Sequence, residues 1–162
     1  MRSLPFFAVL IALLSATCAV ANTSHRGWPR INGDLKMHKT DQSGPLHATK
    51  IRRHNELLGG HGSDVIRAGR VGDVLWGDYK PSGQPTTQVD RIYGGRGRDF
   101  IYASHGSNLI HGGGGADQIH AHFGHGAIWC GRGHPTVFLS HHSRRLYHLH
   151  GCHRVSYKTL GY

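Results

Sequence analysis

Aliphatic residues recur along the middle of this chain at intervals of nine residues, and each has a polar or aromatic neighbour on at least one side. Alternation around an inward apolar residue is typical of a short strand. A single short strand cannot bury its aliphatic residue, whereas stacked strands can, so the repeat predicts an all-β solenoid. The column comprises Ile66, Leu75, Ile92, Ile101, Ile110, Ile119, Ile128 and Val137.

Glycine-rich turns separate these predicted strands. Three stretches, 59–67, 94–102 and 112–120, carry the full pattern Gly-Gly-x-Gly-x-Asp-x-aliphatic-x, and partial copies lie between them. Glycine is needed where a turn takes a positive φ or where backbones approach closely. The interval before Ile92 holds eight extra residues, and its insertion at 79–87 is rich in Pro and Gly, which predicts a surface loop.

Two repeats make one coil of turn, strand, turn and strand, so turns 18 residues apart stack at a spacing of about 4.8 Å. Asp99 and Asp117 are 18 residues apart and are expected to face the same gap. Calcium takes six to eight oxygens at about 2.3–2.6 Å, and carboxylates with turn carbonyls supply such oxygens. The opposite edge carries Asp64 and Asp90, then Asn108 and Gly126.

This pattern over residues 59–138, with 50–58 as a degraded first unit, resembles the hemolysin-type calcium-binding nonapeptide repeats of RTX proteins. The resemblance implies a right-handed parallel β-roll, secretion and calcium-assisted folding. It is stronger to small secreted bacterial proteins made mainly of such repeats than to large toxins, because no effector domain is present. Toxins of this family usually leave the cell by a C-terminal signal, whereas this chain begins with an N-terminal one.

The predicted function is therefore calcium binding between stacked turns, with Ca²⁺ as the cofactor. The best site comprises Gly94, Gly95, Arg96, Gly97, Asp99, Gly112, Gly113, Gly114, Gly115 and Asp117, and poorer sites involve Asp73, Asp64 and Asp90. Arginines at 96 and 98 are expected to weaken cation binding there. The alternative is a metal-independent basic solenoid that binds anionic polymers such as cell wall, polysaccharide or nucleic acid.

The two ends of the chain predict a secreted protein. Residues 1–21 have the features of a signal peptide, namely an early Arg, an apolar run and an Ala-Val-Ala cleavage site. The apolar run is too short for a permanent membrane span. Residues 22–49 are expected to be an irregular leader or cap, 50–138 the repeat β-roll, and 139–162 capping strands. Cys130 and Cys152 remain after cleavage and predict a disulfide worth about 3 kcal/mol.

Composition adds a strong positive charge, with 19 Lys and Arg against 9 Asp and Glu. Such a surface attracts anionic polymers. Of the 16 His, those beside the aliphatic column are expected to stack with aromatic residues, and a zinc or copper site near the C-terminus is a weaker alternative. No hydrolase motif, zinc-protease motif or phosphate loop is present, so the chain is not predicted to be an enzyme.

Overall fold

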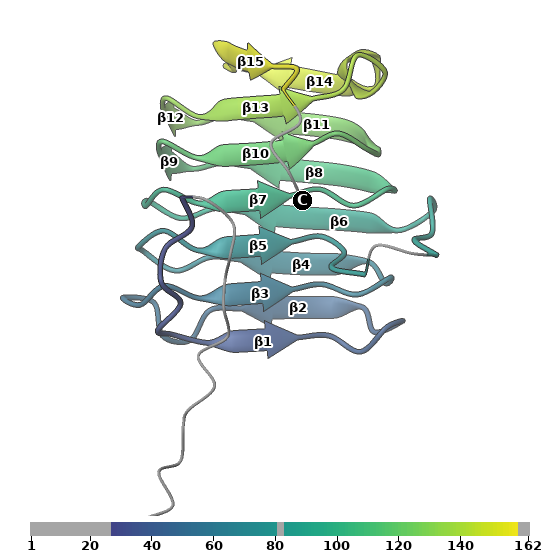
Figure 1. Cartoon of the computed structure of the whole chain (residues 1–162). Helices are drawn as coiled ribbons and strands as arrows, with labels where there is room; N and C mark the ends of the chain where they lie inside the picture. The colour runs from purple at the N-terminus through teal and green to yellow at the C-terminus, as the bar shows by residue number, and fades with distance from the viewer. Residues whose placement is uncertain (1–26, 81–82, 159–162) are drawn as a thin grey trace, which may run out of the picture.

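The aliphatic column of the sequence lies along the axis of a parallel β-solenoid (Figure 1). The computed structural model describes residues 27–80 and 83–158. Two sheets face each other across the core, and successive strands alternate between them. Each sheet therefore takes every second repeat, which confirms two repeats per coil.

The seven-stranded sheet has the order β1 (Leu35–Met37), β3 (Glu56–Leu58), β5 (Val74–Trp76), β7 (Phe100–Tyr102), β10 (Gln118–Ala121), β13 (Thr136–Leu139) and β15 (Arg154–Ser156). The six-stranded sheet has the order β14 (Tyr147–His150), β11 (His125–Trp129), β8 (Ser107–His111), β6 (Val89–Tyr93), β4 (Asp64–Arg67) and β2 (Gly44–His47). Two short strands in the turns, β9 (Gly114–Gly115) and β12 (Arg132–Gly133), pair with each other, and a 3-10 turn, η1 (Ser143–Arg145), precedes β14.

Strand register places aliphatic residues directly above one another. Ile101 pairs with Leu75 on one side and Ile119 on the other, and all three side chains are fully buried. Each side chain would be too small to form a core alone, but the stack removes the whole column from water. This burial stabilises the fold by about 25 cal/mol per Å² of apolar area. Core formation therefore follows from the column, as the sequence predicts.

The lower end of the stack begins earlier than the sequence predicts. Residues 22–49 were expected to be irregular, yet β1 and β2 pair in parallel with β3 and β4. The aliphatic position of β1 is occupied by Lys36, whose Nζ donates a hydrogen bond to the His47 carbonyl and lies 3.7 Å from Asp34 Oδ2. Because a lysine replaces the aliphatic residue, the periodicity of this coil is hidden in the sequence. An inward lysine also discourages further strands from adding to the end.

The described parts of the predicted insertion, residues 79–80 and 83–87, lie outside the strands and leave the stack intact. The backbone N–H of Asp64 donates to Asp90 Oδ1 at 2.9 Å across a separation of 26 residues. The equivalent bond from Asp99 to Asp117 spans 18 residues, so the stacking is the same on both sides of the insertion.

The upper end is closed by strands and a disulfide. The expected alternation after 139 gives β14 and β15, which continue the two sheets in parallel. Cys130 and Cys152 form a disulfide, with their Cα atoms 5.2 Å apart, and Cys130 is fully buried in the core. This link confirms the predicted pairing and ties the last coils together. The predicted signal peptide lies outside the described residues.

Candidate functional site

The turns that lead into the seven-stranded sheet carry one residue each in a vertical series, here called the Asp99 column. From bottom to top it consists of Asp34, Asn55, Asp73, Asp99, Asp117 and Pro135. Asp117 Oδ1 accepts the backbone N–H of Asp99 at 2.9 Å, and Asp99 Oδ1 accepts that of Asp73 at 2.7 Å. The predicted juxtaposition of Asp99 and Asp117 is therefore present, and both side chains are buried.

The second carboxylate oxygen of each turn Asp faces its own glycine turn. Asp99 Oδ2 accepts the backbone N–H of Gly95 at 2.7 Å, and Asp73 Oδ2 accepts that of Gly69 at 2.6 Å. Asp117 differs, because its Oδ2 is buried with no hydrogen-bond partner among the described residues. A buried carboxylate oxygen without a donor is costly unless a cation or proton reaches it.

The turn at 112–117 has a different backbone from the turn below it. Gly113 and Gly115 have φ values of +91° and +100°, which few residues other than glycine adopt. This conformation directs backbone groups toward the neighbouring turns, so that Gly114 N–H donates to Gly95 O at 2.9 Å and Arg132 N–H donates to Gly113 O at 2.8 Å. It also explains why Asp117 has no contact equivalent to the one between Asp99 and Gly95.

The first glycine of each turn is required by oxygen atoms that crowd it. A Cβ on Gly94 would lie 2.2 Å from Gly112 O and 2.9 Å from Asp99 Oδ2. A Cβ on Gly112 would lie 3.0 Å from Asp117 Oδ2 and 3.1 Å from Cys130 O. Carboxylate and carbonyl oxygens thus converge beside these glycines. Oxygens of both kinds are the ligands that calcium prefers.

Burial dominates the electrostatics of this column. It raises the pKa of Asp99 to about 8, and the neighbouring Asp117 and Asp73 carboxylates add to the rise. It raises the pKa of Asp117 to about 7 and also raises the pKa of Asp73. At the lower end, hydrogen bonds from Lys50 and Thr49 hold the pKa of Asp34 at about 2. For Asp99 and Asp73, burial therefore outweighs the hydrogen bonds that favour the charged form.

The opposite turns carry the Asp64 column, which consists of Gly44, Asp64, Asp90, Asn108, Gly126 and Tyr147. Its two ends are filled by side chains. The Nδ1 atom of His38 lies 2.7 Å from Asp64 Oδ1, and both side chains are buried. At the other end, Tyr147 Oη accepts a hydrogen bond from Asn108 Nδ2 at 3.1 Å and donates to the Phe123 carbonyl at 2.9 Å.

Glycines in the Asp64 column make room for these end groups. Gly44 and Gly126 stand where other coils have Asp or Asn. Because glycine has no side chain, the space next to Asp64 and Asn108 is left for His38 and Tyr147. Burial raises the pKa of Asp64, and the His38 contact opposes that rise. Burial raises the pKa of Asp90 to about 7. The gap between Asp64 and Asp90 otherwise resembles the other sites, since a Cβ on Gly59 would lie 2.1 Å from Gly77 O and 2.7 Å from Asp64 Oδ2.

Two turns carry Asn in place of Asp and show what a donor does at this position. Asn108 Nδ2 donates to the carbonyls of Ser104 and Gly106, both at 3.0 Å. Asn55 Nδ2 donates to the carbonyls of Lys50 and Arg53 at 3.3 and 2.6 Å. The amide nitrogen thus binds the turn carbonyls from within. In an Asp turn, a carboxylate oxygen replaces the amide nitrogen and has no hydrogen to donate to the turn carbonyls.

The arginines of the best predicted turn are exposed. The guanidinium of Arg98 lies 5.0 Å from the centre of the Phe100 ring, on the outer surface of the seven-stranded sheet. Sequence reasoning missed Asp34, His38 and Tyr147, because none stands at the repeat position of an identifiable nonapeptide. Asn55 occupies the Asp position of the degraded first unit, residues 50–58.

Comparison with known families agrees with this geometry. Residues 53–78 and 86–121 match the RTX calcium-binding nonapeptide repeat in four copies. The matched residues are therefore copies of the RTX calcium-binding nonapeptide repeat. No curated protein and no solved structure matches the chain.

Other metal chemistry finds no support in the described part of the chain. No three His, Cys, Asp or Glu side chains within residues 27–80 and 83–158 come together as a metal-binding group. His141 instead stacks on Tyr157 with ring centres 4.4 Å apart. The same residues include no helix long and apolar enough to span a bilayer.

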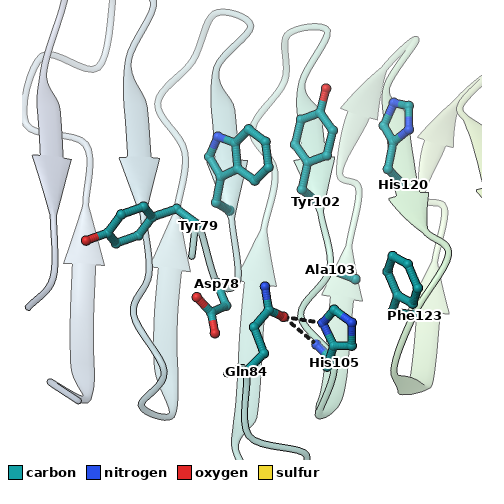
Figure 2. A pocket seen from close by; sticks show the side chains of 9 residues that line it. Asp78, Tyr79, Gln84, Tyr102, Ala103, His105, His120 and Phe123 are labelled. Carbon is teal, nitrogen blue, oxygen red and sulfur yellow. Dashed lines mark hydrogen bonds between the residues drawn. The ribbon is translucent and has the colours of Figure 1, made fainter. Parts of the chain in front are cut away.

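A cavity of about 300 Å³ lies beside the carboxyl ends of β5, β7 and β10 in the seven-stranded sheet (Figure 2). Its lining comprises Trp76, Asp78, Tyr79, Gln84, Tyr102, Ala103, His105, His120 and Phe123. The polar groups engage one another, since Gln84 Oε1 accepts the backbone N–H of His105 at 3.2 Å and Asp78 Oδ1 accepts that of Lys80 at 2.9 Å. Asp78 Oδ2 lies 3.5 Å from His61 Nε2, and burial raises the pKa of Asp78.

Proposed function

We propose that this protein is a secreted calcium-binding β-roll, in which calcium between stacked turns stabilises the fold. The chemistry is binding rather than turnover. The observation that carries the proposal is the contrast between Asn and Asp turns. Each Asn side chain donates to the carbonyls of its own turn, whereas an Asp side chain at the same position brings only acceptor oxygens toward them.

The gap between Asp99 and Asp117 is the main site proposed. Its protein ligands would be these two carboxylates and turn carbonyls such as that of Gly112, which lies beside Asp99 Oδ2. A divalent cation there would offset both the burial of the carboxylates and their mutual repulsion. Asp73 with Asp99 is a second gap in the same column, and Asp64 with Asp90 is a third gap in the opposite column.

The remaining organisation is proposed from sequence and structure together. Residues 1–21 would direct export, and the repeat region would be enclosed by the first coil and by the strands after 139. An exported chain meets millimolar calcium and an oxidising environment, which suit weak turn sites and a disulfide.

Calcium titration of chelator-treated protein tests this function. Melting temperature and far-ultraviolet circular dichroism are followed up to about 10 mM calcium, which exceeds the range of weak extracellular sites. We expect a rise in melting temperature, and magnesium at equal concentration should produce less. A flat response in both measurements contradicts the proposal.

The matched variant is Asp99→Asn with Asp117→Asn. Asn is already accommodated at positions 55 and 108, so the fold should persist while the calcium response is lost. Asp41→Asn removes an exposed carboxylate outside both columns and serves as the control. An unchanged calcium response in the double variant would place the ion elsewhere.

A further inference from the structure

The outer surface of the six-stranded sheet contains no acidic residue at its outward positions. Side chains on either side of each inward residue point outward. One outward series consists of Pro45, Val65, Arg91, Leu109, Ala127 and His148, and the other of His47, Arg67, Tyr93, His111, Trp129 and His150. These residues are half-buried or exposed. The surface therefore has basic groups, rings and small apolar groups in regular rows.

Five members of the second series, Arg67, Tyr93, His111, Trp129 and His150, form a continuous stack of planar groups, here called the ring ladder. The Arg67 guanidinium lies 3.9 Å from the centre of the Tyr93 ring. Ring centres are then 5.0 Å apart from Tyr93 to His111, 4.5 Å from His111 to Trp129 and 5.0 Å from Trp129 to His150, with interplanar angles of 7° or less. The spacing is that of neighbouring strands, so the ladder runs along the solenoid axis.

This stacking decides which part of each ring is available to a ligand. The faces between successive rungs are covered by neighbouring rungs, so an incoming base or sugar cannot insert there. Ring edges carry the positive part of the aromatic quadrupole, and the edges of Trp, Tyr and His also hold polar hydrogens. The ladder thus resembles a row of weak donors with a guanidinium at one end.

The opposite sheet has a different outer surface. Trp28 covers its ring column, donating from Nε1 to Tyr102 Oη at 2.8 Å and lying 5.9 Å from the Trp76 ring. Glu56 also stands at an outward position there. The six-stranded sheet is therefore the better surface for a negatively charged partner.

We propose that the ring ladder, together with Arg91, binds a linear polysaccharide that carries carboxylate groups. The chain would lie along the solenoid axis, across β4, β6, β8 and β11. Charge complementarity selects an anionic polymer, and the regular rows suit a repeating one. Single-stranded nucleic acid is disfavoured because its sequence-tolerant binding depends on free ring faces, which the ladder lacks. The surface lies on a sheet rather than on a turn, so this inference does not depend on calcium binding.

Binding to fluorescently labelled polygalacturonate oligomers tests the proposal, with chelator-treated protein so that calcium cannot bridge the polymer. Arg67→Ala with Arg91→Ala removes two charges from the surface and should weaken binding at least about fivefold. Arg144→Ala with Arg145→Ala removes the same charge from the exposed η1 turn and should leave binding nearly unchanged. Equal weakening by both pairs would show that only net charge matters and would overturn the proposal.

A second pair examines the ladder itself. Tyr93→Phe with Trp129→Phe keeps planar rings in the stack but removes two polar hydrogens, so binding should weaken about twofold to threefold while the melting temperature stays close to that of the parent. Single-stranded DNA of equal charge is the competitor. Binding that is tighter to the DNA, or undetectable for polygalacturonate in low salt, would also overturn the assignment.

Discussion

The Asp99 and Asp64 columns arise from the same repeat but satisfy their carboxylates differently. In the Asp64 column, His38 contacts the lowest carboxylate and Tyr147 contacts the uppermost amide. In the Asp99 column, Asp117 lies beneath Pro135, and its Oδ2 has no hydrogen-bond partner among the described residues. The Asp64 column is closed at both ends by side chains, whereas the upper carboxylate of the Asp99 column is not, and within the Asp64 column Asp90 Oδ2 is likewise buried with no hydrogen-bond partner among the described residues. The comparison teaches that the repeat pattern alone does not decide which turn carboxylates are contacted by side chains from outside the repeat.

The largest effect should come from the feature that both columns share, the space beside the first glycine. Gly94→Ala places a Cβ 2.2 Å from Gly112 O, and Gly59→Ala places one 2.1 Å from Gly77 O. Backbone oxygens cannot move away without shifting a coil, so each variant should lose more than about 3 kcal/mol of unfolding free energy. Urea denaturation measures the loss.

Gly114→Ala is the control for these two variants. Its Cβ would be 3.5 Å from the nearest atom, and its φ is not positive. The change should therefore stay within about 0.5 kcal/mol. A similar loss in all three variants would indicate that glycine content, rather than the crowded oxygens, supports the turns.

The next largest effect separates the columns by their calcium response. Asp99→Asn with Asp117→Asn should remove most of the stabilisation by calcium, which is about 2.7 kcal/mol at a hundredfold excess over Kd. Asp64→Asn with Asp90→Asn should remove less of it, because His38 already contacts one of these two carboxylates, that of Asp64. Calorimetric melting with and without calcium measures both. Equal losses would show that the two columns contribute alike.

A smaller effect concerns pH in the absence of calcium. The folded-state pKa values of Asp99 and Asp117, about 8 and about 7, lie above the unfolded value of about 3.9. The folded protein therefore binds more protons than the unfolded chain in this window. The contribution of these groups to stability is fully present below about pH 4 and is lost as pH rises toward 8.

Calcium should flatten this pH dependence, because the ion replaces the protons and favours the charged carboxylates. The Asp99→Asn, Asp117→Asn variant should flatten it without calcium. Melting temperatures across pH 4–8 in chelator measure the effect. A steeper slope in the variant than in the parent would contradict the assignment of these carboxylates.

The smallest effect comes from the upper closure of the Asp64 column. Tyr147→Phe removes one hydroxyl that contacts Asn108 and Phe123, and should cost about 1 kcal/mol. Its calcium response should be unchanged, since the hydroxyl lies outside the Asp99 column. Tyr157→Phe at a half-exposed ring is the control. A calcium response that disappears in Tyr147→Phe would show that the two columns are coupled.

Much of the fold could be predicted because each repeat states its own local requirements. Ile101 and Ile119 reveal the core, the first glycines reveal where oxygens crowd the backbone, and the 18-residue spacing places Asp99 beneath Asp117. The first coil could not be predicted, because Lys36 occupies the aliphatic position of β1. His38 and Tyr147 were missed because they reach the Asp64 column from outside the nonapeptide pattern.

The sequence by itself determined the periodic parts of this protein: strands, glycine turns, inward aliphatic residues and stacked acidic positions. Those features depend on short-range geometry that repeats in every coil. Only the tertiary structure decided how the ends are closed, which carboxylates have a protein donor, and that ladder rings cover one another's faces. These outcomes depend on contacts between distant segments, such as His38 with Asp64 and Tyr147 with Asn108, and no local pattern encodes them.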